Sequence, residues 1–372
     1  MPSTIVQQGL PIDPPPPASG GRRRRVVGMD AASLAAWMEA LGEPPYRGRQ
    51  IFRWLHARRA RSFEEMTDLP APLRATLAAR ATLDRPAGTA RADSADGSTR
   101  WRLAFADGAQ VEAVHIPDRD RVTLCVSSQV GCRFACTFCA TGMMGLARHL
   151  HGTEIVSEIM CVLEKHQVEP GTPFNVVFMG MGEPLDNLDA VLHAFAVLTD
   201  PDGFGLSWRR VTVSTVGVIS GIRRLAATSP RPRLAISISA TDDATRSRLV
   251  PANRRWPLAA LRQAVLDFPV RPREKVTFEY VLLAGENDTP DDARRLARLA
   301  RGLPVRVNLI PWNEHPDLPH HRPDTAHVER FRDALRAAGI DVTIRFSRGR
   351  DVGAACGQMI LSDRPAEWSS PS

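Results

Sequence analysis

Four of the six cysteines lie within a stretch of 15 residues, at Cys125, Cys132, Cys136 and Cys139. The last three have the spacing C-x3-C-x2-C. Three thiolates can bind three irons of a 4Fe–4S cluster and leave the fourth iron open to a small chelating ligand. The same cysteines could instead form a zinc site completed by His149 or His151, since a structural zinc ordinarily takes four protein ligands. The spacing therefore predicts a metal centre and leaves two kinds of centre open.

A second segment that could take part in this chemistry is Gly180-Met-Gly-Glu-Pro184. It follows a β-branched run, so we expect it at the end of a strand. A glycine-rich backbone with an acid can receive the ammonium group of S-adenosylmethionine (SAM), whose amino and carboxylate groups could chelate an open iron. Together the two segments favour a cluster over zinc.

The elements that must position these residues alternate between strand and helix from about Val122 onward. Because such alternation implies parallel βα units, we predict an α/β fold with a full or partial (β/α) barrel. Reactive residues of such barrels lie at the carboxyl ends of the strands. The expected strands are 122–126, 175–179, 211–214, 234–238, 276–283, 305–310 and 342–346, and the expected helices are 154–165, 188–198, 258–266, 290–299 and 328–338.

The N-terminal part has helical periodicity from Asp30 to about Leu83, with Trp37 and Trp54 expected in its core. The outer side of its second helix carries Arg47, Arg49, Arg53, Arg58 and Arg59. We interpret Ala87–Ser98 as a linker or hairpin loop. The expected organisation is a disordered basic leader (1–26), a helical accessory domain that binds RNA (27–90), the barrel core (91–359) and a C-terminal tail (360–372).

The composition is that of a basic globular chain, with a net charge of +7 and a pI near 9.6. Such a charge suits a polyanionic partner such as nucleic acid. Six cysteines are too few for a disulfide scaffold. The chain has neither an apolar run long enough to span a membrane nor the apolar core of a secretory signal. We therefore expect a cytoplasmic protein that is not bound to membranes.

Three further segments carry a family resemblance: Thr123–Cys132 (TLCVSSQVGC), Asn308–Asn313 (NLIPWN) and Ala354–Gln358 (AACGQ). With the cysteine spacing and the GMGEP segment, the chain resembles the radical SAM superfamily. Within it, the chain resembles the RlmN/Cfr family of adenine-carbon methyltransferases from about Met29 to Met359. The resemblance implies one 4Fe–4S cluster on Cys132, Cys136 and Cys139.

The same resemblance implies methylation of carbon 2 of an adenine in 23S ribosomal RNA, with transfer RNA as a further candidate substrate. It also implies two SAM molecules per turnover, a one-electron donor such as flavodoxin or ferredoxin, and a monomer. Two alternatives stay open. One is carbon 8 methylation of 23S ribosomal RNA, which gives antibiotic resistance, and the other is a non-catalytic iron–sulfur protein that binds RNA.

Two cysteines outside the cluster motif, Cys125 and Cys356, have a chemical reason to be present. Carbons 2 and 8 of adenine are not nucleophiles, so one SAM must first methylate a thiolate. A radical derived from a second SAM then activates that methyl group for addition to the base. A second thiol releases the product by forming a disulfide. By the family resemblance, Cys356 is the methyl carrier and Cys125 is the resolving thiol; Cys161 has no such match and is expected to be a packing residue.

The resemblance also places the proton acceptor at Glu112. The SAM pocket is expected to contain Gly182, Glu183, Ser214, Ser237, Ile238, Ser239 and Asn313. Ser239 departs from the family pattern, in which His or Asn is usual, and the loop Thr141–Leu150 also differs. These departures bear on which carbon is methylated. Arg348 and Arg350 could hold phosphates or simply lie in a solvated loop.

Overall fold

The protein is described here by a computed structural model that covers residues 23–118 and 121–361. The first 22 residues of the expected leader and residues 362–372 of the expected tail lie outside this description. The disordered leader was expected to extend to residue 26, but residues 24–26 already belong to the folded structure. Arg24–Arg25 form strand β1, which pairs in parallel with β2 (Ala81–Thr82), and Val26 is fully buried. Backbone pairing and burial of Val26 thus order the last residues of that segment.

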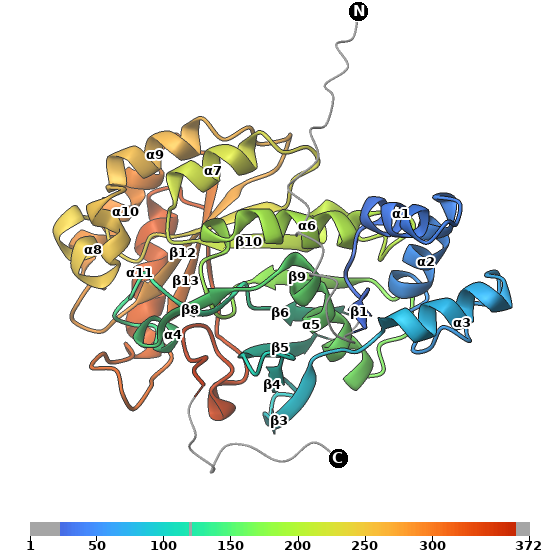
Figure 1. The fold of residues 1–372 in the computed structure, drawn as a ribbon. Helices are drawn as coiled ribbons and strands as arrows, with labels where there is room; N and C mark the ends of the chain where they lie inside the picture. Colours follow the sequence, from blue (N-terminus) through green and yellow to red (C-terminus); the bar gives the residue numbers. More distant parts are fainter. Residues whose placement is uncertain (1–22, 119–120, 362–372) are drawn as a thin grey trace, which may run out of the picture.

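The N-terminal helices lie at one end of the molecule (Figure 1). They are α1 (Ala31–Ala40), α2 (Tyr46–His56) and α3 (Ala71–Arg80). Asp30 caps α1 by accepting a 2.7 Å hydrogen bond from the backbone N–H of Ser33. Trp37 is buried, as expected. Trp54 is only partly buried, and its indole N–H donates to Asp68 across 2.6 Å.

The core of the molecule is a ten-stranded sheet in the order β14-β13-β12-β11-β10-β9-β6-β5-β4-β3. The seven strands from β6 to β14 pair in parallel, which confirms the predicted α/β fold of the partial barrel type. Each strand matches an expected one closely. They are β6 (Arg121–Cys125), β9 (Phe174–Phe178), β10 (Val211–Thr215), β11 (Arg233–Ser237), β12 (Val276–Leu282), β13 (Val305–Pro311) and β14 (Val342–Ile344).

Helices connect the parallel strands and cover the sheet (Figure 1). Five of them match the expected helices: α5 (Gly152–Lys165), α6 (Leu188–Thr199), α9 (Leu258–Leu266), α10 (Pro290–Ala300) and α11 (Thr325–Ala337). Two shorter ones, α7 (Ile219–Ala226) and α8 (Asp243–Leu249), were not expected. Within the described ranges, no helix has the length and apolar character needed to cross a membrane.

An antiparallel extension continues the sheet beyond β6. It consists of β3 (Ala87–Asp93), β4 (Thr99–Ala104) and β5 (Gln110–Asp118), and β5 pairs with β6. The interpretation of Ala87–Ser98 as a linker was therefore wrong for its first seven residues. Strand β3 is half-exposed at the edge of the sheet. Its residues alternate from Thr89 to Asp93, but the apolar positions hold only alanine, which is depleted in strands and so gives no clear strand signal. Only the turn that joins β3 to β4 fits the expected hairpin loop.

Candidate active site

The three motif cysteines lie in residues 132–139, which we call the cysteine loop. It begins at the last strand residue of a short hairpin beyond the carboxyl end of β6. The hairpin pairs β7 (Gln129–Cys132) with β8 (Gly145–His149), and helix α4 (Ala140–Met143) connects the loop back to β8. Gly131 has a φ of +79°, and a side chain there would collide with the carbonyl of Gly145. The local backbone therefore requires glycine one residue before the first motif cysteine.

The thiols of Cys132, Cys136 and Cys139 interact with one another. Burial raises the pKa of all three, and for Cys136 the charges of Cys139, Cys132 and Glu183 raise it further. Metal binding would offset this by deprotonating the thiols. Within the described ranges, no group of three His, Cys, Asp or Glu side chains is close enough to hold a single ion. An iron–sulfur cluster does not require three ligands around one ion, because each thiolate binds a different iron. Three mutually interacting thiols are therefore compatible with a cluster.

Glu183 lies next to these thiols, at the end of the GMGEP segment. Its carboxylate accepts hydrogen bonds from the backbone N–H groups of Val216 (2.8 Å) and Leu185 (3.0 Å), and its own N–H donates to Gln129. Burial raises its pKa to about 7. Gly182 has a φ of +97° and packs against Gln129, so a larger residue would not fit. The segment presents a fixed acid beside the predicted cluster.

The rest of the predicted SAM pocket lies at the ends of β10 and β11, where Ser214 and Ser237 are the strand residues. Ile238 is buried. Ser239, the residue that departs from the family pattern, is fully buried with a φ of +52°, and its hydroxyl has no hydrogen-bond partner within the described ranges. A strained backbone and an unsatisfied hydroxyl at this point are typical of a ligand site.

Arg246 on α8 is a site residue that the sequence did not reveal. Its guanidinium donates to the carbonyls of Ile238 (2.9 Å), Ser237 (3.0 Å) and Val216 (2.7 Å). Arg246 is fully buried, and this burial lowers the pKa of its guanidinium to about 10. The charge of the nearby Cys136 acts in the opposite direction. Arg246 therefore fixes the turn after β11 beside the cysteine loop.

Cys356 lies against the cysteine loop although it is far away in the sequence. The backbone N–H of Ala140 donates to the carbonyl of Gly357 across 2.7 Å. The side-chain amide of Asn313, which follows β13, donates to the carbonyl of Cys356 across 3.1 Å. The Cys356 charge also contributes to the raised pKa of Cys139. The structure thus brings together the predicted cluster ligands, the predicted methyl carrier and one SAM-pocket residue.

Cys125, the last residue of β6, faces the same space. Burial raises the pKa of its thiol, and neighbouring Cys356 raises it further. All six cysteines are free thiols in the structure. Arg345 directly follows β14 and interacts with Cys125 and Cys356. Its pKa is raised, chiefly by the charge of Cys356 and to a smaller extent by that of Glu279. Arg345 is a second site residue that sequence reasoning missed.

Glu112 lies on β5, with its carboxylate fully buried. Its two oxygens are 3.6 Å from the guanidinium groups of Arg100 and Arg102 on β4. Burial raises the pKa of Glu112 to about 7 even though both arginines lower it. Arg100 also donates to the carbonyl of Gly353, across 3.1 Å, which ties β4 to the segment that carries Cys356.

Ser127 joins Glu112 to the strand that ends at Cys125. Its hydroxyl donates to the carbonyl of Glu112 across 2.7 Å, and its N–H donates to the buried carboxyl of Glu158 across 3.0 Å. Ser127 follows Cys125 by two residues. The proposed proton acceptor and the proposed resolving thiol are therefore held by one short network.

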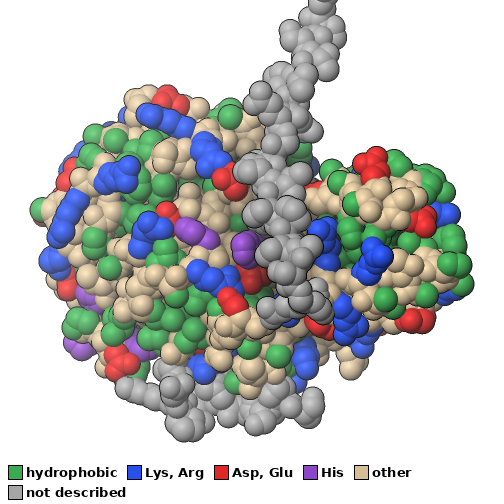
Figure 2. Space-filling model, in the orientation of Figure 1, with side chains coloured by type: hydrophobic (Ala, Val, Ile, Leu, Met, Phe, Trp, Pro, Cys, Tyr) green, Lys and Arg blue, Asp and Glu red, His purple; other side chains and the backbone are tan. Residues whose placement is uncertain are grey.

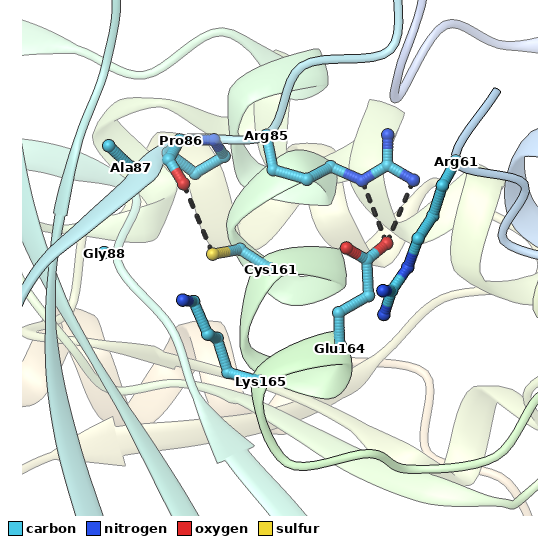
Figure 3. A pocket seen from close by; sticks show the side chains of 8 residues that line it. All are labelled: Arg61, Arg85, Pro86, Ala87, Gly88, Cys161, Glu164 and Lys165. Atoms are coloured by element: carbon cyan, nitrogen blue, oxygen red, sulfur yellow. Dashed lines mark hydrogen bonds and ion pairs between the residues drawn. The ribbon is translucent and has the colours of Figure 1, made fainter. Parts of the chain in front are cut away.

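Cys161 lies elsewhere, as expected for a packing residue. It is buried on α5, and its thiol donates to the carbonyl of Pro86 across 3.3 Å (Figure 3). It borders an open pocket of about 540 Å³ whose lining contains none of the predicted site residues. The residues that line this pocket are Arg61, Arg85, Pro86, Ala87, Gly88, Cys161, Glu164 and Lys165.

The arginines of α2 and of the residues directly after it do not form an open basic face. Arg49 and Arg53 pair with Asp202, across 2.6 Å in both cases, and Arg59 donates to the backbone carbonyls of Val168 and Glu169. Arg58 lies 4.0 Å from the centre of the Trp54 ring. On the face of the molecule that Figure 2 shows, Lys and Arg side chains are interspersed with acidic and apolar ones. Several of these arginines are therefore engaged in ion pairs or hydrogen bonds within the protein.

A partial (β/α) barrel with a three-cysteine loop and a glycine–glutamate segment at the carboxyl ends of its strands defines a radical SAM protein. Residues 126–300 match the radical SAM superfamily. Residues 25–83 match the ribosomal RNA large subunit methyltransferase N-terminal domain. The chain belongs to the RlmN family of radical SAM RNA methyltransferases.

Several relatives support this assignment over most of their length. The dual-specificity RNA methyltransferase RlmN of Anaeromyxobacter dehalogenans is 47% identical over 90% of this chain and 91% of its own. The protein of the same name from Syntrophobacter fumaroxidans is 42% identical over 88% of this chain and 95% of its own. The crystal structure of a radical SAM methyltransferase from Sphaerobacter thermophilus superposes with a TM-score of 0.86, at 41% identity, and covers 91% of this chain and 100% of that one.

Proposed function

We propose that this protein methylates carbon 2 of an adenine in 23S ribosomal RNA, with transfer RNA as a second substrate, through S-methylated Cys356. The single observation that supports this best is the convergence of Cys356, Cys125 and the cysteine loop at one end of the barrel. Relatives named as dual-specificity RNA methyltransferases support the two RNA classes. Such substrates would place the enzyme in the cytoplasm.

The predicted cofactors fit the residues present. Cys132, Cys136 and Cys139 would hold the cluster, while Glu183 and Asn313, together with the residues at the ends of β10 and β11, would hold SAM. When bound, the cluster supplies the electron that cleaves SAM, and an external one-electron donor such as flavodoxin or ferredoxin would restore it. We expect a monomer, because the described site is complete within one chain.

The chain's own residues have separate tasks in this proposal. The Cys356 thiolate accepts a methyl group from SAM, and the Arg345 guanidinium lies close enough to interact with its charge. Glu112 accepts the proton that leaves the adenine ring carbon. Cys125 releases the product by forming a disulfide with Cys356, and reduction of that disulfide returns both thiols.

The test is mass analysis of nucleosides from RNA that has been treated with the anaerobically reconstituted enzyme, SAM and a reductant. Unmodified 23S ribosomal RNA and transfer RNA from a host lacking its own enzyme serve as substrates. We expect 2-methyladenosine in both. Appearance of 8-methyladenosine instead would replace the carbon 2 assignment, and the absence of any methylated adenosine would contradict the proposed function.

A further inference from the structure

An exposed aromatic ring lies in the segment that joins β14 to Cys356. Phe346 is 52% exposed, although exposure of so large an apolar side chain to water is unfavourable. It follows β14 by two residues and therefore lies at the carboxyl ends of the parallel strands, where the cysteine loop also lies. Nothing in the reaction described so far requires this ring.

The residues on both sides of Phe346 contact the site. Arg345 places its Nη1 3.4 Å from the Sδ of Met179 and interacts with Cys356 and Cys125. The hydroxyl of Ser347 accepts a 3.0 Å hydrogen bond from the same Asn313 amide nitrogen that donates to Cys356. The side-chain nitrogen of Asn313 thus connects Ser347 to Cys356, the proposed methyl carrier. Because neighbouring side chains alternate along extended backbone, the ring between them lies on the outer side of this segment.

An exposed arginine, Arg350, follows Phe346 by four residues in the same segment. Arg350 is exposed, and within the described part of the chain it makes no side-chain hydrogen bond or ion pair. Its charge contributes, after burial, to the lowered pKa of Arg322. Arg322 itself donates to the backbone carbonyls of Pro311 and Trp312, so Arg350 is the one of the two guanidinium groups that can bind an anion. An exposed aromatic ring and an exposed cation four residues apart in one segment suit single-stranded RNA, in which bases stack on aromatic side chains and phosphates bind cations.

We infer that Phe346 is a stacking platform for an unpaired base of the RNA substrate and that Arg350 contacts a phosphate of the same strand. The inference rests on the proposed function, since it assumes an RNA substrate at this site. Stacking is tolerant of base identity. Phe346 therefore holds the strand that carries the target adenine and does not select the adenine itself.

The test measures binding of a fluorescently labelled RNA hairpin with an adenosine loop to the anaerobically reconstituted holoenzyme. The variants are Phe346→Trp, Phe346→Leu and Phe346→Ala. Stacking of one base on an aromatic ring predicts a loss of affinity of about tenfold in both Phe346→Leu and Phe346→Ala. Phe346→Trp should bind at least as tightly as the original protein. A 2-aminopurine in the loop should be quenched by the original protein and by Phe346→Trp, and quenched less by the other two.

Leu266→Ala is the matched control, because Leu266 is also an exposed apolar residue, at 43%, but lies on the outer helix α9. It should not change affinity. Arg350→Gln should lower the slope of log affinity against log salt by about one, and the Phe346 variants should not change that slope.

Iron content and melting temperature establish that each variant is folded. Equal affinity and equal quenching in Phe346→Ala, Phe346→Leu and the original protein would overturn the stacking role. If the original protein methylates RNA nonetheless, only this inference fails. If it methylates no RNA, the proposed function fails with it.

Discussion

The backbone N–H of Ala140 donates a 2.7 Å hydrogen bond to the carbonyl of Gly357, and the hydroxyl of Thr141 donates a 2.6 Å bond to the carbonyl of Met359. Ala140 directly follows the last motif cysteine, and Gly357 directly follows Cys356. The position of the proposed methyl carrier therefore depends on the cysteine loop.

Thr141→Val should weaken this connection. The change keeps the shape of the side chain and leaves the buried carbonyl of Met359 without its partner, at a cost of about 1–3 kcal/mol of stability. We expect slower S-methylation of Cys356. Iron content measured on the same sample separates this effect from loss of the hydrogen bond between Thr141 and Cys139. Thr76→Val, which removes a similar bond on the exposed helix α3, is the control and should change neither quantity. Faster or equal S-methylation in Thr141→Val would show that the connection does not position Cys356.

Glu112 should give RNA methylation a pH dependence. Its pKa is raised to about 7 by burial, so the carboxyl is mostly protonated below pH 7 and cannot accept a proton. The rate of transfer from methylated Cys356 to RNA should rise with pH through about 7. Single-turnover rates between pH 6 and pH 8 measure this. Glu112→Gln should keep methylated Cys356 and lose the transfer, and a rate independent of pH would contradict the assignment.

The same pKa shift predicts an effect on stability. In the unfolded chain Glu112 has a pKa near 4.5, and folding raises it, so the folded state favours the protonated form. Its contribution is present below about pH 4.5 and is lost as pH rises through about 7. The free energy of unfolding of Glu112→Gln, relative to the original protein, should therefore increase between pH 5 and pH 8 in denaturant titrations. A constant difference over that range would contradict the shift.

The arginines of α2 and of the residues directly after it should contribute little to RNA affinity, in contrast to what their sequence indicates. Arg53 is paired with Asp202, and Arg59 is buried against backbone carbonyls. Arg53→Gln should leave the salt dependence of RNA binding unchanged, since no phosphate contact is lost. Arg59→Met should lower the melting temperature. A slope that falls by about one in Arg53→Gln would show that Arg53 leaves Asp202 to bind RNA.

The parallel strands and long helices could be predicted because β-branched runs and helical periodicity are local signals. Strand β3 could not, since the apolar positions of its alternating sequence hold only alanine, which does not favour a strand, and its pairing is decided by its neighbours in the sheet. Helix α8 is short and polar, and without it Arg246 had no predicted position. The cysteine loop, Cys356 and Glu112 were found by residue type, spacing and family resemblance. Arg246 and Arg345 were missed because only the folded barrel brings their charges to the cysteines.

Ser239, which replaces the His or Asn usual in the family, also shows what the sequence alone could not predict. The sequence reveals that the residue is unusual, but not that it is fully buried with a φ of +52°, or that its hydroxyl finds no hydrogen-bond partner among the residues that the structure describes. Burial and backbone strain arise from packing between β11 and its neighbours, which no local pattern encodes.

The central claim is that Cys356 carries the methyl group and Cys125 releases the product. The most direct test is denaturing gel analysis of Cys125→Ala after it has been expressed with SAM and RNA available. This variant can still accept a methyl group and attack the base, but it cannot form the disulfide. We predict a covalent protein–RNA adduct through the peptide that contains Cys356, and no adduct in the double variant Cys125→Ala/Cys356→Ala. A Cys125→Ala enzyme that turns over normally, or a Cys356→Ala enzyme that methylates RNA, would contradict the account.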